Sequence, residues 1–130
     1  STGIFSLASQ NYILNAGQSI IFTGYSDNVE NLDGAIGALI TSSKPVAVNS
    51  GNALGGIQSG RADFALDQIV SSSQIGNEYI FIEGNGLEDM ELPLLVANED
   101  NTEIYINDAT IPNAIINAGD YYLVNNNFIF

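Results

Sequence analysis

Carboxylates, hydroxyls and two cations are the groups left for acid–base or nucleophilic chemistry, because the chain contains no histidine and no cysteine. Asp63 and Asp67 form the most suggestive pair, with Arg61 close by in sequence. On a helix the two carboxylates would share a face, and Arg61 could keep one of them ionised. Glycoside hydrolysis needs two carboxylates at a fixed separation. A solvated acidic face with a local ion pair explains the same residues, so no catalytic residue is predicted.

Calcium binding is a second use for the acidic residues, since hard cations prefer carboxylate and carbonyl oxygens supplied by loops. The segment 27–33 offers Asp27, Glu30 and Asp33 as ligands. Its spacing differs from that of an EF-hand, because Leu32 occupies the glycine position. Ordinary polar turns account for the same residues, because Asn and Asp are common turn formers. Ca²⁺ in this loop is therefore an expectation to be tested, and no other cofactor is expected. Two further acidic segments have similar character: 88–91 and 98–101.

The six tyrosines could provide a contact surface for a protein or a glycan. Tyr105 is the best placed, because it lies in a predicted strand over 103–107 with alternating polarity. In that strand Ile104 and Ile106 should point inward. Glu103 and Tyr105 should then face water. Packing in the core or at its rim is the alternative for a strand tyrosine.

The charge of the chain excludes several classes of function. The chain contains fifteen acidic residues and only two basic ones, Lys44 and Arg61, which gives a formal net charge of -13. Such a chain repels phosphate backbones, so no nucleic acid is expected as a partner. Without His or Cys there is no conventional catalytic triad, no thiolate nucleophile and no soft-metal site. No apolar run approaches the length of a membrane span, so membrane insertion is not expected either.

Short apolar runs separated by Gly, Asn, Asp and Ser are typical of an all-β domain. At 130 residues, 45% of them hydrophobic, the chain is long enough for one packed core. We therefore predict a single β domain over residues 1–130, an antiparallel sandwich-like fold with at most one short helix. Because the chain starts at Ser1 rather than Met and ends in an apolar stretch, we expect a module of a longer secreted protein.

The expected elements follow from the positions of the apolar runs. Apolar residues from Ala62 to Val70 have the spacing of one helix face, and the glycine-rich segment 49–60 is expected to be a loop. Segments 94–97 and 103–107 are expected to pair across the turn between them. Further strands are predicted at 4–7, 12–14, 19–23, 34–40, 45–48, 78–83, 121–124 and 128–130.

Two distant segments have nearly the same sequence. Residues 13–18, Ile-Leu-Asn-Ala-Gly-Gln, are echoed by residues 115–120, Ile-Ile-Asn-Ala-Gly-Asp. Each is followed by an apolar stretch, so each is predicted to be a hairpin bend of the same type. Convergent turn chemistry is one explanation, because Asn and Gly are the usual turn formers. A duplicated hairpin, one in each half of a sandwich, is the other.

Several segments together resemble a known family. They are 41–52, 67–70, 76–81, 96–104 and 116–121, and they cover roughly residues 35 to 124. In their order and character they resemble the IgGFc-binding-protein N-terminal domain, which occurs in animal mucin-like proteins and in large bacterial surface proteins. The cysteines common in animal members are missing, so the resemblance implies no disulfide framework here. The antibody binding in the family's name belongs to the animal protein and is not carried over.

The resemblance implies a secreted or surface-displayed β-module of an adhesin-like or matrix protein, not an enzyme. We therefore expect a non-catalytic extracellular binding or adhesion module presented at a cell surface. Its partner would be a protein or a glycan on another surface, or neighbouring copies of itself. A self-assembling subunit of a fibre or coat is one alternative, because the apolar ends 4–7 and 128–130 could pair with another chain. A carboxylate-based glycan-active enzyme is the other.

Overall fold

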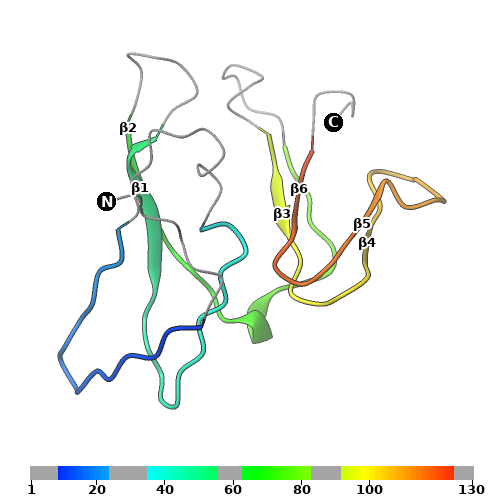
Figure 1. Ribbon diagram of the computed structural model, residues 1–130. Helices are drawn as coiled ribbons and strands as arrows, with labels where there is room; N and C mark the ends of the chain where they lie inside the picture. Colours follow the sequence, from blue (N-terminus) through cyan, green and yellow to red (C-terminus); the bar gives the residue numbers. More distant parts are fainter. Residues whose placement is uncertain (1–8, 24–34, 56–62, 83–91, 125–130) are drawn as a thin grey trace. The chain divides into compact units, whose positions relative to one another are not determined.

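The computed structural model describes residues 9–23, 35–55, 63–82 and 92–124 (Figure 1). The chain divides into two compact units, residues 1–36 and 37–130, and each is described by itself. The described part of the first unit includes a turn at residues 15–18 and no strand. The second unit contains all the strands of the described ranges.

The all-β prediction is confirmed. The described strands form three two-stranded antiparallel sheets, and the one helical element among them is the short 3₁₀ helix η2, Ser72–Gln74. The Ser71 side chain accepts a hydrogen bond from the Ser73 amide at the start of η2. The sheets pair β1 (Asn49–Gly55) with β2 (Asp63–Gln68), β3 (Leu94–Val96) with β6 (Tyr121–Leu123), and β4 (Thr102–Ile104) with β5 (Ala114–Ile116).

The β1–β2 hairpin corrects two predictions. The segment expected to be a loop provides β1, and the segment expected to be a helix provides β2. The Ile69 amide donates to the Val48 carbonyl at 2.9 Å, which extends the pairing beyond β2. An irregularity in the register between Asn52 and Gly55 accommodates the glycine-rich strand, as a β-bulge does. Cross-strand pairing thus overrides an apolar spacing that fits a helix over barely two turns.

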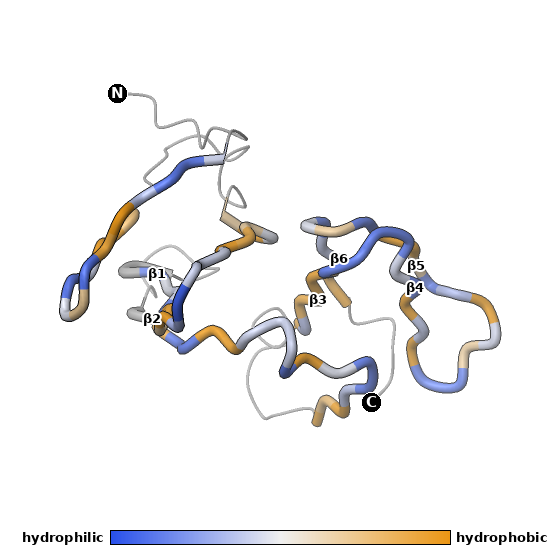
Figure 2. Tube along the Cα trace, turned by 90° about the horizontal axis from the view of Figure 1, so that it is seen from below, coloured by the Kyte–Doolittle hydropathy of each residue, from blue (hydrophilic) through white to orange (hydrophobic). Residues whose placement is uncertain are grey.

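Other predicted strands are absent from the described ranges. Residues 12–14, 19–23, 35–40, 45–48 and 78–82 have no strand assignment. In the segment 19–23, Ile21 is 83% exposed. A segment with strand propensity forms a strand only where a neighbouring segment pairs with its backbone hydrogen-bonding groups. Figure 2 shows that apolar stretches lie both in paired strands such as β3 and in this unpaired N-terminal segment. The strands predicted at 4–7 and 128–130 lie outside the described residues.

The predicted pairing of 94–97 with 103–107 is wrong. Leu95 lies opposite Tyr122, so β3 pairs with β6, whereas Glu103 lies opposite Ile115, so β4 pairs with β5. The segment between β3 and β4 forms a turn in which Thr102 Oγ1 donates to the Glu99 carbonyl. That turn directs the chain from one sheet into the next instead of closing a hairpin.

The most buried residues of the described ranges lie in and beside these two sheets. Ala97, Ile104 and Val124 are only 4–7% exposed. The predicted alternation along 103–107 is confirmed, because Ile104 is buried and Ile106 half-buried while Glu103 and Tyr105 are exposed. The core of this unit therefore fixes which face of β4 points to solvent.

Candidate binding surface

A turn at residues 117–120 connects β5 to β6 and positions both. The Asp120 amide donates to the Asn117 carbonyl at 2.9 Å, and Gly119 takes the positive φ of 85° that this turn requires. The carboxylate of Asp120 in turn accepts a hydrogen bond from the Asn117 amide at 3.1 Å. Residue types that favour this geometry, Asn and Gly, stand at the positions that need them.

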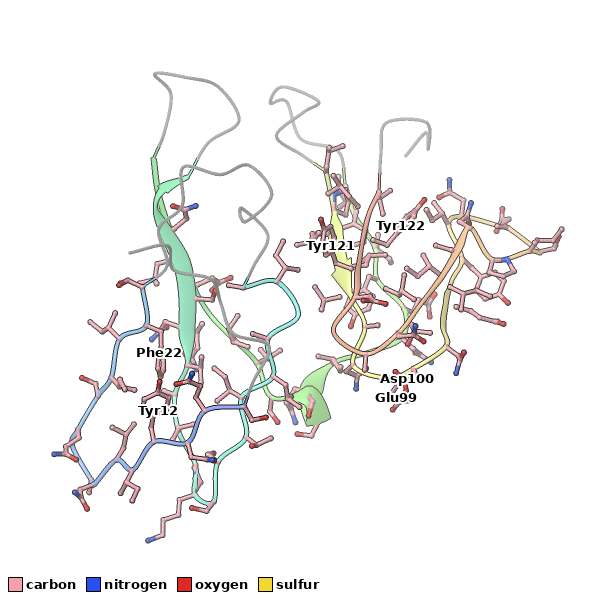
Figure 3. The ribbon with its side chains drawn as sticks, viewed as in Figure 1. Tyr12, Phe22, Glu99, Asp100, Tyr121 and Tyr122 are labelled. Atoms are coloured by element: carbon pink, nitrogen blue, oxygen red, sulfur yellow. The ribbon has the colours of Figure 1, made fainter. Side chains whose placement is uncertain are left out.

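Asp100 and Asn117 join this turn to the loop that precedes β4 by reciprocal contacts. The Asp100 Oδ1 accepts from the Ala118 amide at 3.1 Å, and the Asn117 Oδ1 accepts from the Asn101 amide at 3.3 Å. Figure 3 shows Asp100 and its neighbour Glu99 on this loop. Asn101 has a φ of 57°, a conformation that Asn tolerates better than most residues. These contacts fix the near ends of β4 and β5 against each other.

Main-chain hydrogen bonds reinforce the same junction. The Gly119 amide donates to the Ala97 carbonyl at 2.9 Å, and the Ala97 amide donates to the Asp120 carbonyl at 3.0 Å. These bonds continue the β3–β6 ladder into the turn. The loop 97–101 and the turn 117–120 are thus one interlocked unit.

The far ends of β4 and β5 are also fixed. The Asn113 side chain accepts from the Ile106 amide at 2.9 Å, and the Asn113 amide donates to the Ile104 carbonyl at 2.7 Å. A turn follows Ile106, whose carbonyl accepts from the Ala109 amide at 3.3 Å. Hydrogen bonds therefore hold the β4–β5 hairpin at both ends, so the backbone that carries its exposed side chains has a fixed conformation.

The outward face of this hairpin presents Glu103, Tyr105 and Ile115, which we call the Tyr105 surface. Glu103 and Ile115 are directly opposite each other across β4 and β5 and therefore share a face. Tyr105 lies two residues beyond Glu103, and its hydroxyl donates to Glu103 Oε2 at 2.5 Å. Tyr105 is 49% exposed and Ile115 is 59% exposed. The predicted outward position of Tyr105 is confirmed.

Glu103 sets the electrostatics of this surface. Its hydrogen bond with the phenol raises the pKa of Tyr105, and desolvation and the negative charge of the carboxylate act in the same direction. The phenol is protonated at neutral pH even at its ordinary pKa of 10.0, and the raised pKa extends this donor state to higher pH. No lysine or arginine of the described ranges forms an ion pair with Glu103, whose recorded partner is the Tyr105 hydroxyl.

The other predicted sites have different outcomes. Asp27, Glu30 and Asp33 lie outside the described residues, and the described residues contain no group of three acidic side chains placed to hold a metal ion. Asp63 and Asp67 lie in β2 instead of a helix. Four residues of extended strand separate their Cα atoms by roughly 13 Å. The one-turn helical separation that motivated the pair is therefore not formed.

The sequence did not predict that Ile115 belongs to the Tyr105 surface or that Asp100 anchors the turn at 117–120. The β4–β5 register determines which residue faces Glu103, and the wrong pairing placed β4 against 94–97. Asp100 was considered only as a calcium ligand, whereas its carboxylate accepts a backbone amide. The spacing of Glu103 and Tyr105, two apart on a strand, was the available signal that they are neighbours.

A family model described as IgGFc binding protein matches residues 5–130. The chain belongs to the IgGFc binding protein family. This match confirms the resemblance inferred from the sequence. The match does not show a bacterial origin. No curated protein and no solved structure matches the chain. Domains of this family are binding domains, typically extracellular, and the family is not known for enzymatic activity. Among the described residues, no helix has the length and apolar character needed to span a membrane.

Proposed function

We propose that this domain is a non-catalytic, extracellular protein-binding module presented at a cell surface, and that the Tyr105 surface contacts its partner. The match of the IgGFc binding protein family to residues 5–130 is the observation that supports this most strongly. It makes binding, and not catalysis, the expected activity. The helical carboxylate pair behind the glycan-active alternative is replaced by a strand, so that alternative has lost its geometric motivation.

The chemistry of the Tyr105 surface supports a role in protein contact. An exposed tyrosine offers a large apolar ring with a polar tip, and tyrosine is enriched at protein interfaces. Ile115 adds aliphatic area beside a carboxylate on the same face. Because the hairpin is hydrogen-bonded at both ends, little conformational entropy would be lost on binding.

The proposal is tested by surface plasmon resonance against purified extracellular proteins, immunoglobulin G Fc among them, and against a glycan array. We expect a protein partner whose affinity falls at least about tenfold in Tyr105→Ala, as for an interface anchor. Tyr79→Ala is the matched control, since Tyr79 is also exposed but bonds only to Gly76 in its own segment. Equal loss in both variants, or glycan cleavage that disappears in Asp67→Asn, would contradict the proposal.

Self-assembly is a second candidate, favoured by the exposed apolar side chains of residues 9–23. Ile13 is 92% exposed, and this segment contains no charged residue in a chain of net charge -13. An uncharged apolar segment is where copies of an acidic chain could meet without repulsion. Light scattering over a concentration series tests this candidate. A strict monomer at high concentration would exclude it, whereas Ile13→Ser should weaken any association.

The predicted calcium site at Asp27, Glu30 and Asp33 is part of the proposal. If the loop binds Ca²⁺, millimolar calcium should raise the melting temperature, because a ligand that binds only the folded state stabilises it. Asp27→Asn combined with Asp33→Asn should abolish the gain. A melting temperature that does not respond to calcium in the unmutated domain would contradict this part.

A further inference from the structure

Within the described ranges, no cationic side chain is paired with the Tyr105 surface. Glu103 Oε2 accepts a hydrogen bond from the Tyr105 hydroxyl, while Oε1 accepts none from the residues that the structure describes. The chain contains only two basic residues against fifteen acidic ones, and Lys44, the one within the described ranges, forms no ion pair there. Among the described residues, a carboxylate oxygen and an exposed tyrosine ring thus lie side by side on the outward side of the β4–β5 hairpin.

These groups together fit one kind of side chain. An aromatic ring attracts a cation placed over its face, and a carboxylate accepts hydrogen bonds from the same cation. A guanidinium can do both at once, because it is planar, stacks on aromatic rings and presents several N–H donors. Ile115, opposite Glu103, adds an aliphatic contact beside this pair.

We infer that the partner of the Tyr105 surface is a protein segment that presents an arginine next to an apolar side chain. The guanidinium stacks on Tyr105 and donates to Glu103 Oε1, and the apolar side chain packs on Ile115. This inference rests on the proposed function, because it names the chemistry of the partner at the same surface. The charge of -13 favours a basic partner and disfavours nucleic acid or a second copy at this face.

General attraction of a cation to an acidic protein must be separated from recognition at this surface. Exposed charges more than a Debye length apart, about 8 Å at physiological salt, are largely screened. A contact at the Tyr105 surface should therefore survive physiological salt and depend on Glu103. Non-specific attraction should depend equally on any acidic residue.

The test is an NMR titration of the folded domain at about 150 mM NaCl. The probe is a short peptide that contains one arginine beside one leucine, and the control peptide carries neutral citrulline in place of arginine. We expect shifts centred on the amides of Glu103, Tyr105 and Ile115 with the arginine peptide and none with the citrulline peptide. A lysine peptide should bind more weakly, because an ammonium does not stack.

Two variants with the same change in charge complete the test. Glu103→Gln should weaken the arginine peptide about fivefold, the scale of one exposed charge pair. Glu99→Gln should leave binding unchanged, because Glu99 lies in the turn before β4 and not on the Tyr105 surface. Tyr105→Leu should also weaken binding, whereas Tyr105→Phe, which keeps the ring, should retain it.

Either of two results would overturn the inference: no localised shift with the arginine peptide, or equal loss in Glu103→Gln and Glu99→Gln. If Tyr105→Ala still impairs binding of a whole protein partner while the arginine peptide fails, the inference is wrong and the proposed function stands. If Tyr105→Ala has no effect on that protein partner, the proposed function itself is wrong at this surface.

Discussion

The two echoed segments fold into the same turn, but their surroundings differ. In the first, the Gln18 amide donates to the Asn15 carbonyl at 3.0 Å, and Gly17 has a φ of 80°. In the second, Asp120 and Asn117 form the same bond at 2.9 Å, with Gly119 at 85°. In both, the side chain of the fourth residue accepts from the amide of the first. Local sequence therefore determines the turn in both places.

Only the second turn is anchored to other parts of the described chain. The amides of Ala118 and Gly119 donate to Asp100 Oδ1 and to the Ala97 carbonyl. In the first turn, the amides of Ala16 and Gly17 have no such acceptor among the described residues. The turn at 117–120 consequently continues into β6, whereas neither flank of the turn at 15–18 is a strand.

The first segment has local contacts of its own. The rings of Tyr12 and Phe22 meet edge to face with centroids 4.9 Å apart, which brings the two flanks of the turn together (Figure 3). Yet Ile13 and Ile21 stay largely exposed. A turn and one aromatic pair are therefore not sufficient to form a hairpin. A neighbouring strand and a side-chain acceptor such as Asp100 are needed as well.

The largest expected effect comes from a glycine that packs against the anchored turn. A Cβ on Gly37 would overlap the carbonyl of Gly119, and Gly37 also has a positive φ of 78°. We expect Gly37→Ala to lower the free energy of unfolding by about 3 kcal/mol, from overpacking and backbone strain together. Gly17→Ala is the matched control, because φ is similar and no atom lies within 4 Å of its Cβ. If urea unfolding gave the same loss of unfolding free energy for both variants, the close packing of Gly37 against Gly119 would not contribute to stability.

The anchor itself should have a smaller effect. Asp100→Ala leaves the Ala118 amide without its acceptor and should cost about 1–2 kcal/mol of unfolding free energy. Glu99→Ala removes the same charge from the neighbouring position, where the carboxylate accepts no hydrogen bond from the described residues, and should change stability by less than about 0.5 kcal/mol. Thermal and urea unfolding of both variants measure the difference. Identical stabilities would show that Asp100 does not anchor the turn.

The smallest effect concerns the pH dependence of the Tyr105 surface. The pKa of Tyr105 is raised above its ordinary value of 10.0, chiefly by the hydrogen bond to Glu103. The associated stability is present in full below that ordinary value and is lost as the pH rises through the raised pKa. Glu103→Gln should lower the pKa of Tyr105, measured from its ring resonances by NMR. Unchanged titration in that variant would contradict the Glu103 contact.

Much of the fold class and one feature of the candidate surface could be predicted from the sequence. Alternating polarity along 103–107 correctly placed Ile104 inside and Tyr105 outside. The Asn-Ala-Gly pattern correctly indicated a turn at both sites, because these residue types encode it within four positions. The family was also recognised from the order of its segments.

Pairing could not be predicted, because it depends on residues far apart in the chain. Nothing local distinguishes Ala114–Ile116, which pairs with β4, from 94–97, which was expected to do so. The same ambiguity explains why β2 was predicted to be a helix. Ala65 and Leu66 are compatible with a helix or a strand, and only their pairing with β1 decides between the two. The prediction that both echoed turns are hairpin bends is wrong. The turn at 117–120 joins strands of two different sheets, and the described residues on either side of the turn at 15–18 form no strands.

Amide hydrogen exchange, followed residue by residue by NMR, tests most directly the claim that the same turn is anchored in only one of its two copies. The amides of Ala118 and Gly119 should exchange at least about tenfold more slowly than those of Ala16 and Gly17, because only the former pair has acceptors within the described chain. In Asp100→Ala, protection should fall at Ala118 first. Equal protection in the two turns, or protection at Ala16 that exceeds that at Ala118, would contradict the account.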